Sequence, residues 1–140
     1  MTTPAPAKPK RQPIPKITDV AIDVLNERHW TQGQLQDAAG QVCIRGALQV
    51  ARVRLEKYMP LAATVAKYQD ADAAVLQTIQ QTEPTCQSME DWNDMWATDV
   101  EDVIGVLRRA GEYLVADDVR SVNQRLGDLM RQVTGCKPGV

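Results

Sequence analysis

Apolar residues recur every three or four positions along most of this 140-residue chain, which is the spacing of one buried face of an α-helix. The first such stretch starts at Thr18, a residue type that often caps helix N-termini, and fades near His29. A second stretch covers residues 44–59 and stops at Pro60, because proline cannot continue a helix. The pattern predicts two helices here, with Thr18 as the N-cap of the first.

The middle of the chain carries the same periodicity. A third helix is expected over about 61–81, with room for an interruption at 69–72, and Pro84 follows its end. Ser88 and Thr98 each begin an S/T-x-x-D/E sequence, in which a side chain caps the first backbone N–H groups of a helix. Each of these two residues is therefore expected to start a further helix.

The first of these helices is a short turn that carries Trp92 and Trp96, and the second runs from Val100 to about Leu114. A last helix is expected over about 117–133. Its apolar face consists of Val119, Val122, Leu126, Leu129, Met130 and Val133. No strand pattern competes with these helices, so the predicted fold class is mainly α.

Two non-helical regions frame the predicted bundle. Residues 30–42 lack a helical period, and Asp37 to Gly40 predict the turn of a loop or short hairpin. Residues 1–16 are rich in proline and basic residues, which predicts a disordered basic tail. We expect one domain of four or five helices over 17–134, followed by a flexible C-terminus at 135–140.

Charge is unevenly distributed, although the formal net charge is only -2. Nine acidic residues and no Lys or Arg lie between Tyr68 and Leu107, whereas the predicted helix over 44–59 is mainly basic. The candidate basic surface on that helix consists of Arg45, Arg52, Arg54 and Lys57. Such faces either pair with each other in the fold or bind a partner of complementary charge.

The basic surface and the basic tail together are candidate contacts for DNA phosphates. The helix lacks a recognisable helix-turn-helix companion, and no aromatic residues interleave with the basic ones. The small net charge also gives no general attraction to nucleic acid or acidic membranes. DNA binding is therefore an alternative and not the leading interpretation.

The sequence carries no signature of the common enzyme classes, of a metal site or of a cofactor-binding motif. His29 is the only histidine, and its spacing places neither a nucleophile nor an orienting acid beside it. Cys43, Cys86 and Cys136 are widely spaced and are interpreted as reduced thiols. The sequence shows no signal peptide or membrane-spanning run. We expect a non-enzymatic cytoplasmic protein without a cofactor.

Four short motifs occur in the order Trp30-Thr31-Gln32-Gly33, Cys43-Ile44-Arg45-Gly46-Ala47-Leu48, Trp92-Asn93-Asp94 and Thr98-Asp99-Val100-Glu101-Asp102-Val103. Over roughly residues 20–110, the chain resembles a small domain family of actinobacteria and their phages. That family typically reads G-W-T-Q-G, C-x-x-G-A-L, W-N-D and T-x-E-E-V, and it has no assigned function. His29 stands where the family usually has glycine, and the stretch from about 55 to 89 looks longer or unrelated.

Two interpretations are open for the motif residues. In the first they are structural: Trp30 and Trp92 fill gaps between helices, and Asn93 or Asp94 ties down the W-T-Q-G loop through backbone hydrogen bonds. In the second, the two tryptophans wall a candidate small-molecule pocket whose polar groups are His29, Asn93 and Asp94.

The leading functional hypothesis is an interaction protein, encoded by a phage or prophage, that binds a host or phage macromolecule through a charged helical surface. A protein is the expected partner. The alternatives are a DNA-binding regulator that uses the helix over 44–59 with the tail, and a ligand-binding protein with the pocket described above. The sequence predicts neither the identity of the partner nor the oligomeric state.

Overall fold

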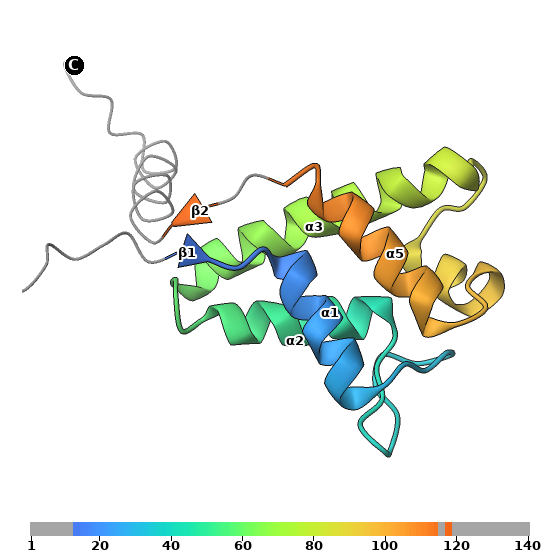
Figure 1. The fold of residues 1–140 in the computed structure, drawn as a ribbon, viewed down its shortest axis with the longest axis horizontal. Helices are drawn as coiled ribbons and strands as arrows, with labels where there is room; N and C mark the ends of the chain where they lie inside the picture. Colours follow the sequence, from blue (N-terminus) through green and yellow to red (C-terminus); the bar gives the residue numbers. More distant parts are fainter. Residues whose placement is uncertain (1–12, 115–116, 119–140) are drawn as a thin grey trace, which may run out of the picture.

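The computed structural model describes residues 13–114 and 117–118, and most of them are helical (Figure 1). The elements are, in order, β1 (Pro13–Ile14), α1 (Ile17–Arg28), α2 (Ile44–Leu55), α3 (Leu61–Thr82), α4 (Met89–Asp91), the π-helical turn η1 (Trp92–Trp96), α5 (Val100–Gly111) and β2 (Asp117–Asp118). The predicted fold class, a mainly α bundle, is confirmed.

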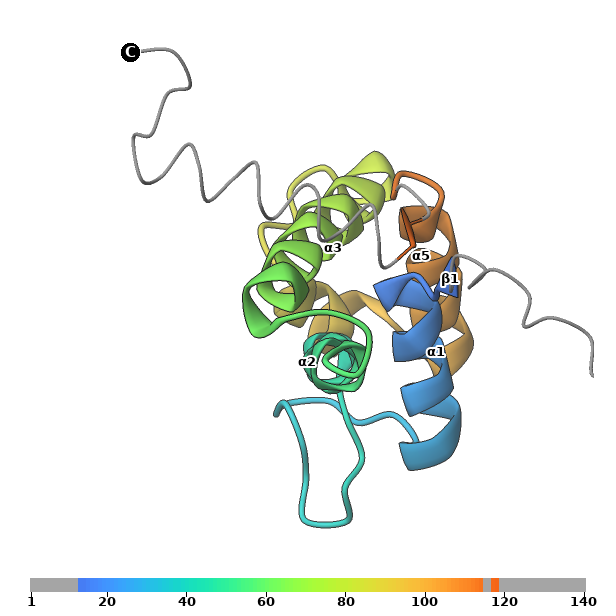
Figure 2. The ribbon, with the colours of Figure 1, turned by 90° about the vertical axis from the view of Figure 1, so that its left-hand side faces the viewer.

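The long helices pack in two layers (Figures 1 and 2). α1 lies beside α5 in one layer, and α2 lies beside α3 in the other. α1 also packs on α2 and α3 on α5, so each long helix has a neighbour in both layers. The loop over residues 30–42 projects from the bundle between the end of α1 and the start of α2.

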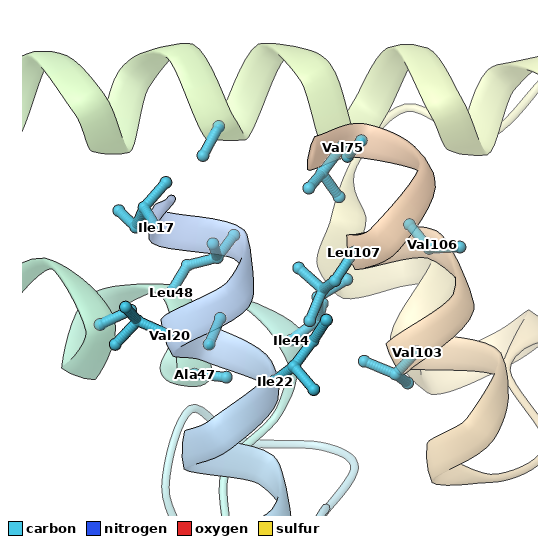
Figure 3. Packing of buried hydrophobic residues seen from close by; sticks show 14 of the residues in the cluster. Ile17, Val20, Ile22, Ile44, Ala47, Leu48, Val75, Val103, Val106 and Leu107 are labelled. Atoms are coloured by element: carbon cyan, nitrogen blue, oxygen red, sulfur yellow. The ribbon is translucent and has the colours of Figure 1, made fainter. Parts of the chain in front are cut away.

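The core between the layers is aliphatic, as expected for a chain without phenylalanine. Figure 3 shows Ile22 of α1 and Leu107 of α5 directed into the space between these two helices. Trp92 is buried, whereas Trp30 and Trp96 pack against the core with part of their surface exposed. The hydrophobic effect on these side chains, about 25 cal/mol per Å² of buried apolar surface, holds the layers together.

Two helix boundaries differ from the predicted ones. α2 ends at Leu55 and is followed by a turn, although the periodicity predicted helix up to Met59. Met59 is nevertheless buried. The apolar pattern therefore predicts its burial correctly and its helical conformation wrongly. α3 runs through 69–72 without the interruption that was considered possible. Alanines at positions 71, 73 and 74 favour the continuous helix.

Side-chain caps start the last two helical segments. Ser88 accepts a hydrogen bond from the backbone N–H of Asp91, as predicted. At α5 the cap is shifted by one residue, because Asp99 and not Thr98 accepts from the N–H of Asp102. The Asp102 carboxylate in turn accepts from the N–H and the hydroxyl of Thr98. These bonds, first of all the one from the Thr98 backbone, hold the pKa of Asp102 below its ordinary value.

The predicted N-cap role of Thr18 is wrong. α1 begins at Ile17, after Lys16, and Thr18 lies buried in its first turn. The Thr18 Oγ1 has no hydrogen-bond partner and faces Gly111, where an added Cβ would lie 2.7 Å from it. Lys16 Nζ donates to the carbonyl oxygen of Gly111 over 2.8 Å. Lys16 and Thr18 therefore join the start of α1 to the end of α5.

The folded domain starts earlier than predicted. Pro13 and Ile14 form β1, which pairs antiparallel with Asp117 and Asp118 of β2, and Ile14 is buried. The last four residues of the predicted tail over 1–16 thus belong to the fold, while residues 1–12 lie outside the described part. Of the predicted last helix over 117–133, the first two residues form a strand instead. The rest, and the expected flexible end at 135–140, also lie outside the described residues.

Candidate functional site

Asn93 is the centre of a hydrogen-bond network that joins three of the sequence motifs. Its side chain is fully buried. Oδ1 accepts from Nε1 of Trp30 over 2.7 Å and from the backbone N–H of Ile44 over 3.0 Å. Nδ2 donates to the carbonyl oxygen of Thr31 over 3.2 Å and to Oδ1 of Asp94 over 3.0 Å. A carboxamide has two donor hydrogens and two acceptor lone pairs. All four are used here.

Two further contacts fasten the loop of residues 30–33 to the π-helical turn. Gln32 Nε2 donates to the carbonyl oxygens of Asn93 and Ala97, at 2.9 and 3.2 Å. The N–H of Gly33 donates to Oδ1 of Asp94 over 2.9 Å. The predicted tie between Asp94 or Asn93 and the W-T-Q-G loop is confirmed. Gln32 belongs to the W-T-Q-G motif, but the sequence does not identify it as a site residue. Its spacing in the chain does not indicate a partner more than sixty residues away.

The tip of the loop is the turn over Asp37 to Gly40 that the sequence predicts. Asp37 Oδ1 accepts from the N–H groups of Ala39 and Gln41, and the N–H of Gly40 donates to the Asp37 carbonyl oxygen. Gly40 has a φ of 84°, in the left-handed region that favours glycine. The loop is thus held at its tip by Asp37 and at its base by Asn93.

The start of α2 packs directly against this loop. Cys43 caps the helix, since its Sγ accepts from the N–H of Gly46 over 3.3 Å. Its own N–H donates to the carbonyl oxygen of Leu35. A Cβ at position 46 would lie 2.1 Å from that same oxygen, so only glycine permits this approach of the loop to the helix. Cys43 thus has a structural duty, and both it and Cys86 are free, buried thiols.

The π-helical turn separates what this segment buries from what it exposes. The N–H of Ala97 donates to the carbonyl oxygen of Trp92, the five-residue spacing of a π-helix. Trp92 and Asn93 point inward, whereas Met95 is 74% exposed and Trp96 partly exposed. The sequence pattern does not predict the exposure of Met95, because exposure within a π-helical turn depends on how the turn packs against the rest of the fold.

Four of the five residues of the candidate pocket lie together, and the fifth, His29, lies apart from them. Trp30, Asn93 and Asp94 are joined by the hydrogen bonds above, and Trp92 is buried in the same turn. A groove of about 490 Å³ is lined by Trp92, Trp96, Glu83, Glu101, Asp102, Gly105, Arg108 and Arg109, and not by the other four pocket residues. The Asn93 amide has no donor or acceptor left for a ligand. The structural interpretation of the motifs therefore accounts for their geometry.

His29 stands apart from this network. Its side chain is exposed, and its backbone has a φ of 70° and a ψ of 165°, a region populated almost only by glycine. Its carbonyl oxygen accepts from the N–H of Val42, which holds the loop in this conformation. The strain explains why glycine suits this position.

Substituting glycine for His29 is therefore expected to stabilise the domain by about 1 kcal/mol. This figure is the backbone strain that glycine relieves, minus the additional conformational entropy that glycine loses on folding. Urea unfolding measures the change. His29→Ala is the control, because alanine keeps the strained backbone and should bring no gain. Equal stability of the glycine and alanine variants would show that the backbone strain is not the cause.

The residues of the candidate basic surface are spread over different partners. Arg45 forms ion pairs with Asp72 and Glu90, and it also donates to the hydroxyl of Tyr68. Arg52 pairs with Glu56 one turn along the helix and donates to the hydroxyl of Thr64.

The other two basic side chains also have intramolecular contacts. Arg54 donates two hydrogen bonds to Glu27 of α1, and these bonds hold the pKa of Glu27 below and that of Arg54 above its ordinary value. The ammonium group of Lys57 lies over the ring of Tyr58. Acidic side chains thus neutralise the three arginines, on neighbouring elements for Arg45 and Arg54 and at the end of the same helix for Arg52.

The acidic residues of the segment 91–102 have no such counter-charges. We call Asp91, Asp94, Asp99, Glu101 and Asp102, together with Met95, the acidic surface. All six are exposed, and none of the five acids forms an ion pair among the described residues. The segment forms one end of the bundle, at the right of Figure 1. This segment therefore carries negative charge that no ion pair among the described residues offsets.

The described residues lack two features that mark other classes of protein. Nowhere in residues 13–114 do three or more His, Cys, Asp or Glu side chains come together as metal ligands would. None of the helices there has the length and apolarity needed to cross a membrane.

The fold and the hydrogen-bonded motifs define a small, mainly helical domain held together by a polar network around one asparagine. Residues 9–113 match the model of a family of unknown function (DUF6197), and the chain belongs to this family. No curated protein and no solved structure matches the chain significantly. The family assigns no activity, so a functional interpretation depends on the surface of this chain itself.

Proposed function

We propose that the protein is a non-enzymatic interaction domain that binds a basic protein partner through the acidic surface. One observation carries the proposal. The arginines of α2 are neutralised within the fold, whereas the acids of the segment 91–102 are not. Residues 13–114 hold fifteen acidic and nine basic side chains, so the excess is negative over the whole described domain.

The acidic surface also offers an apolar contact. Met95 of the same segment is 74% exposed, and methionine is enriched at protein interfaces, where its flexible side chain adapts to a partner. Beside it, the groove along Trp96 has an aromatic wall, and its charged lining consists of Glu83, Glu101, Asp102, Arg108 and Arg109. An exposed apolar residue in a segment with unpaired acids fits a partner that presents an apolar side chain among lysines and arginines.

The same observation disfavours the DNA-binding alternative. Phosphate contacts need cations that are free to replace the counterions of DNA. Arg45 and Arg54 each have acidic partners on other elements and would have to break these ion pairs first. The unpaired acids of the acidic surface would in addition repel the phosphates.

Affinity capture with the full chain tests the proposal. A host lysate should yield one basic protein in stoichiometric amount, and nuclease treatment should leave it bound. Raising the salt from about 0.05 to 0.5 M should release most of it, because exposed charges are screened at that ionic strength. Retention only of nucleic acid, or no specific retention at low salt, would contradict the proposal.

The setting of this interaction is part of the proposal. We propose a phage or prophage gene in an actinobacterial host, and action in the cytoplasm. The resemblance of the four motifs to an actinobacterial and phage family supports the first of these.

A further inference from the structure

The outer face of α5 carries its charges symmetrically about a glycine, with the signs reversed. Glu101 and Asp102 lie four and three residues before Gly105, and Arg109 and Arg108 lie four and three residues after it. A helix turns by about 100° per residue, so all four charged side chains lie within about 60° of Gly105 around the helix axis. These five residues therefore share one face, and all of them line the groove that also contains Glu83, Trp92 and Trp96.

Gly105 has no evident duty within the described domain. An added Cβ would meet no heavy atom within 4 Å, and the backbone of Gly105 is not in the left-handed region that favours glycine. Glycine inside a helix lowers the stability of that helix relative to alanine. A residue without a side chain does, however, allow another backbone to approach closely. Glycine at this position thus points to a contact with a helix from outside the described fold.

The charged side chains of this face also lack opposite charges. None of the four forms an ion pair within residues 13–114, and the side chains of Glu101 and Arg108 form no hydrogen bond there. The helix dipole favours acids in the first turn and bases in the last, which explains the order of the signs. The dipole does not explain why both pairs lie on one face at equal distances from a glycine.

We infer that two copies of this chain associate through this face, with their α5 helices antiparallel and crossing at Gly105. In a two-fold symmetric contact the same patch of both copies must be complementary to itself. The antiparallel arrangement meets this condition, because Glu101 then lies opposite Arg108 of the second copy, and Asp102 lies opposite Arg109. The contact contains each of these pairs twice. A parallel arrangement would instead place acids against acids.

The inference does not depend on the proposed function. Only Glu101 and Asp102 of the acidic surface belong to this face, and the other members precede α5. Trp96 lines the same groove with part of its surface exposed, and it adds an apolar contact to the charged ones. Exposed ion pairs stabilise little and are screened by salt, so we expect a weak, salt-sensitive dimer.

Sedimentation velocity of the full chain tests the inference. Between about 10 and 500 μM the average mass should rise toward that of two copies, and about 0.5 M salt should reverse the rise. Glu101→Arg and Arg108→Glu each turn two attractive contacts of the dimer into repulsive ones. Each variant alone should therefore associate at least about tenfold more weakly. An equimolar mixture of the two should regain native association, because both contacts between unlike copies are attractive again.

Asp19→Arg is the matched control, since Asp19 is likewise an exposed acid in the first turn of a helix, and it should leave association unchanged. A native chain that stays monomeric over this concentration range would overturn the inference. A mixture of the two charge-reversed variants that stays monomeric would also overturn it. Arg108→Glu leaves the whole acidic surface in place, so capture of a basic partner by this variant tests the proposed function separately.

Gly105→Leu provides an independent test of the crossing point. Leucine has free space in the single chain and favours the helix, so the melting temperature at low protein concentration should not fall. In the dimer the new side chain would hold the two helices apart at their crossing. Association should therefore weaken at least about tenfold. Native association of this variant would contradict a crossing at Gly105.

Discussion

Replacing Asn93 with leucine is expected to destabilise the domain by about 3 to 5 kcal/mol, a large share of the stability of a domain of this size. Leucine has a similar volume but cannot hydrogen-bond. The indole N–H of Trp30, the N–H of Ile44 and the carbonyl oxygen of Thr31 would lose their partner, and each such group costs about 1 to 3 kcal/mol when it stays buried. Urea unfolding followed by circular dichroism measures the loss.

Asn26→Leu provides the control for the same exchange of residue types. Asn26 is exposed on α1, and leucine is a good helix former, so this variant should be as stable as the native chain within about 0.5 kcal/mol. A loss below about 1 kcal/mol for Asn93→Leu would mean that water or a rearranged loop replaces the lost bonds.

Gly46→Ala is the second change with a large expected effect, a destabilisation of about 2 to 4 kcal/mol. The added Cβ would lie 2.1 Å from the carbonyl oxygen of Leu35, which is a backbone atom held by the N–H of Cys43. Either the loop or α2 must move. The higher helix propensity of alanine, worth about 1 kcal/mol, offsets only part of this cost. Thermal and urea unfolding give the sign and the size.

Gly105→Ala is the matched variant, because Gly105 also lies inside a helix but has no atom within 4 Å of an added Cβ. Here the propensity gain acts alone, and a stabilisation of about 0.5 to 1 kcal/mol is expected. The two glycine-to-alanine changes should therefore have opposite signs. Two gains of similar size would show that the loop yields to the new methyl group at no cost.

Local patterns in the sequence were enough to predict most helices and the turn. The apolar periodicity located α1, α2, α3 and α5, and Ser88 marked its helix start correctly. Asp37 to Gly40 form the predicted turn, since both the Asx contacts and the glycine conformation depend only on neighbouring residues. These features arise from interactions within a few residues, which a single sequence displays.

Features that depend on distant residues were predicted less well. Thr18 has the residue type of a cap, but its role is determined by Gly111, which is distant in sequence and lies beside it in the fold. Pro13 and Ile14 looked like tail, because their strand partner lies more than a hundred residues away. The candidate basic surface depended on charge partners in α1, α3 and α4, and helix spacing within α2 does not reveal them.

The candidate site shows the same division. The motifs indicated that Trp30, Asn93 and Asp94 belong together, and a tie between these segments was predicted. The sequence did not predict which residues of the π-helical turn are buried and which are exposed. The reason is that the wider turn shifts Met95 outward relative to an α-helix. That shift separates the residues that hold the fold from those available to a partner.

A surface variant can therefore remove the proposed binding without touching the Asn93 network. Asp91→Asn, Met95→Ser and Glu101→Gln together remove two charges and the exposed apolar contact. None of these three side chains is hydrogen-bonded or ion-paired among the described residues, and Asp91 and Glu101 lie outside the loop contacts. The melting temperature of this triple variant should stay within about 2 °C of the native value, since surface substitutions of this kind change the free energy of unfolding little.

The most direct test of the proposed function is the amount of basic partner that this variant retains from a host lysate, relative to the native chain. The control variant removes the same groups elsewhere, through Asp19→Asn, Val65→Ser and Glu112→Gln, all at exposed positions. The account predicts at least about a tenfold loss of partner for the surface variant and native retention for the control, since a few central residues dominate an interface. Equal retention by the two folded variants would contradict it.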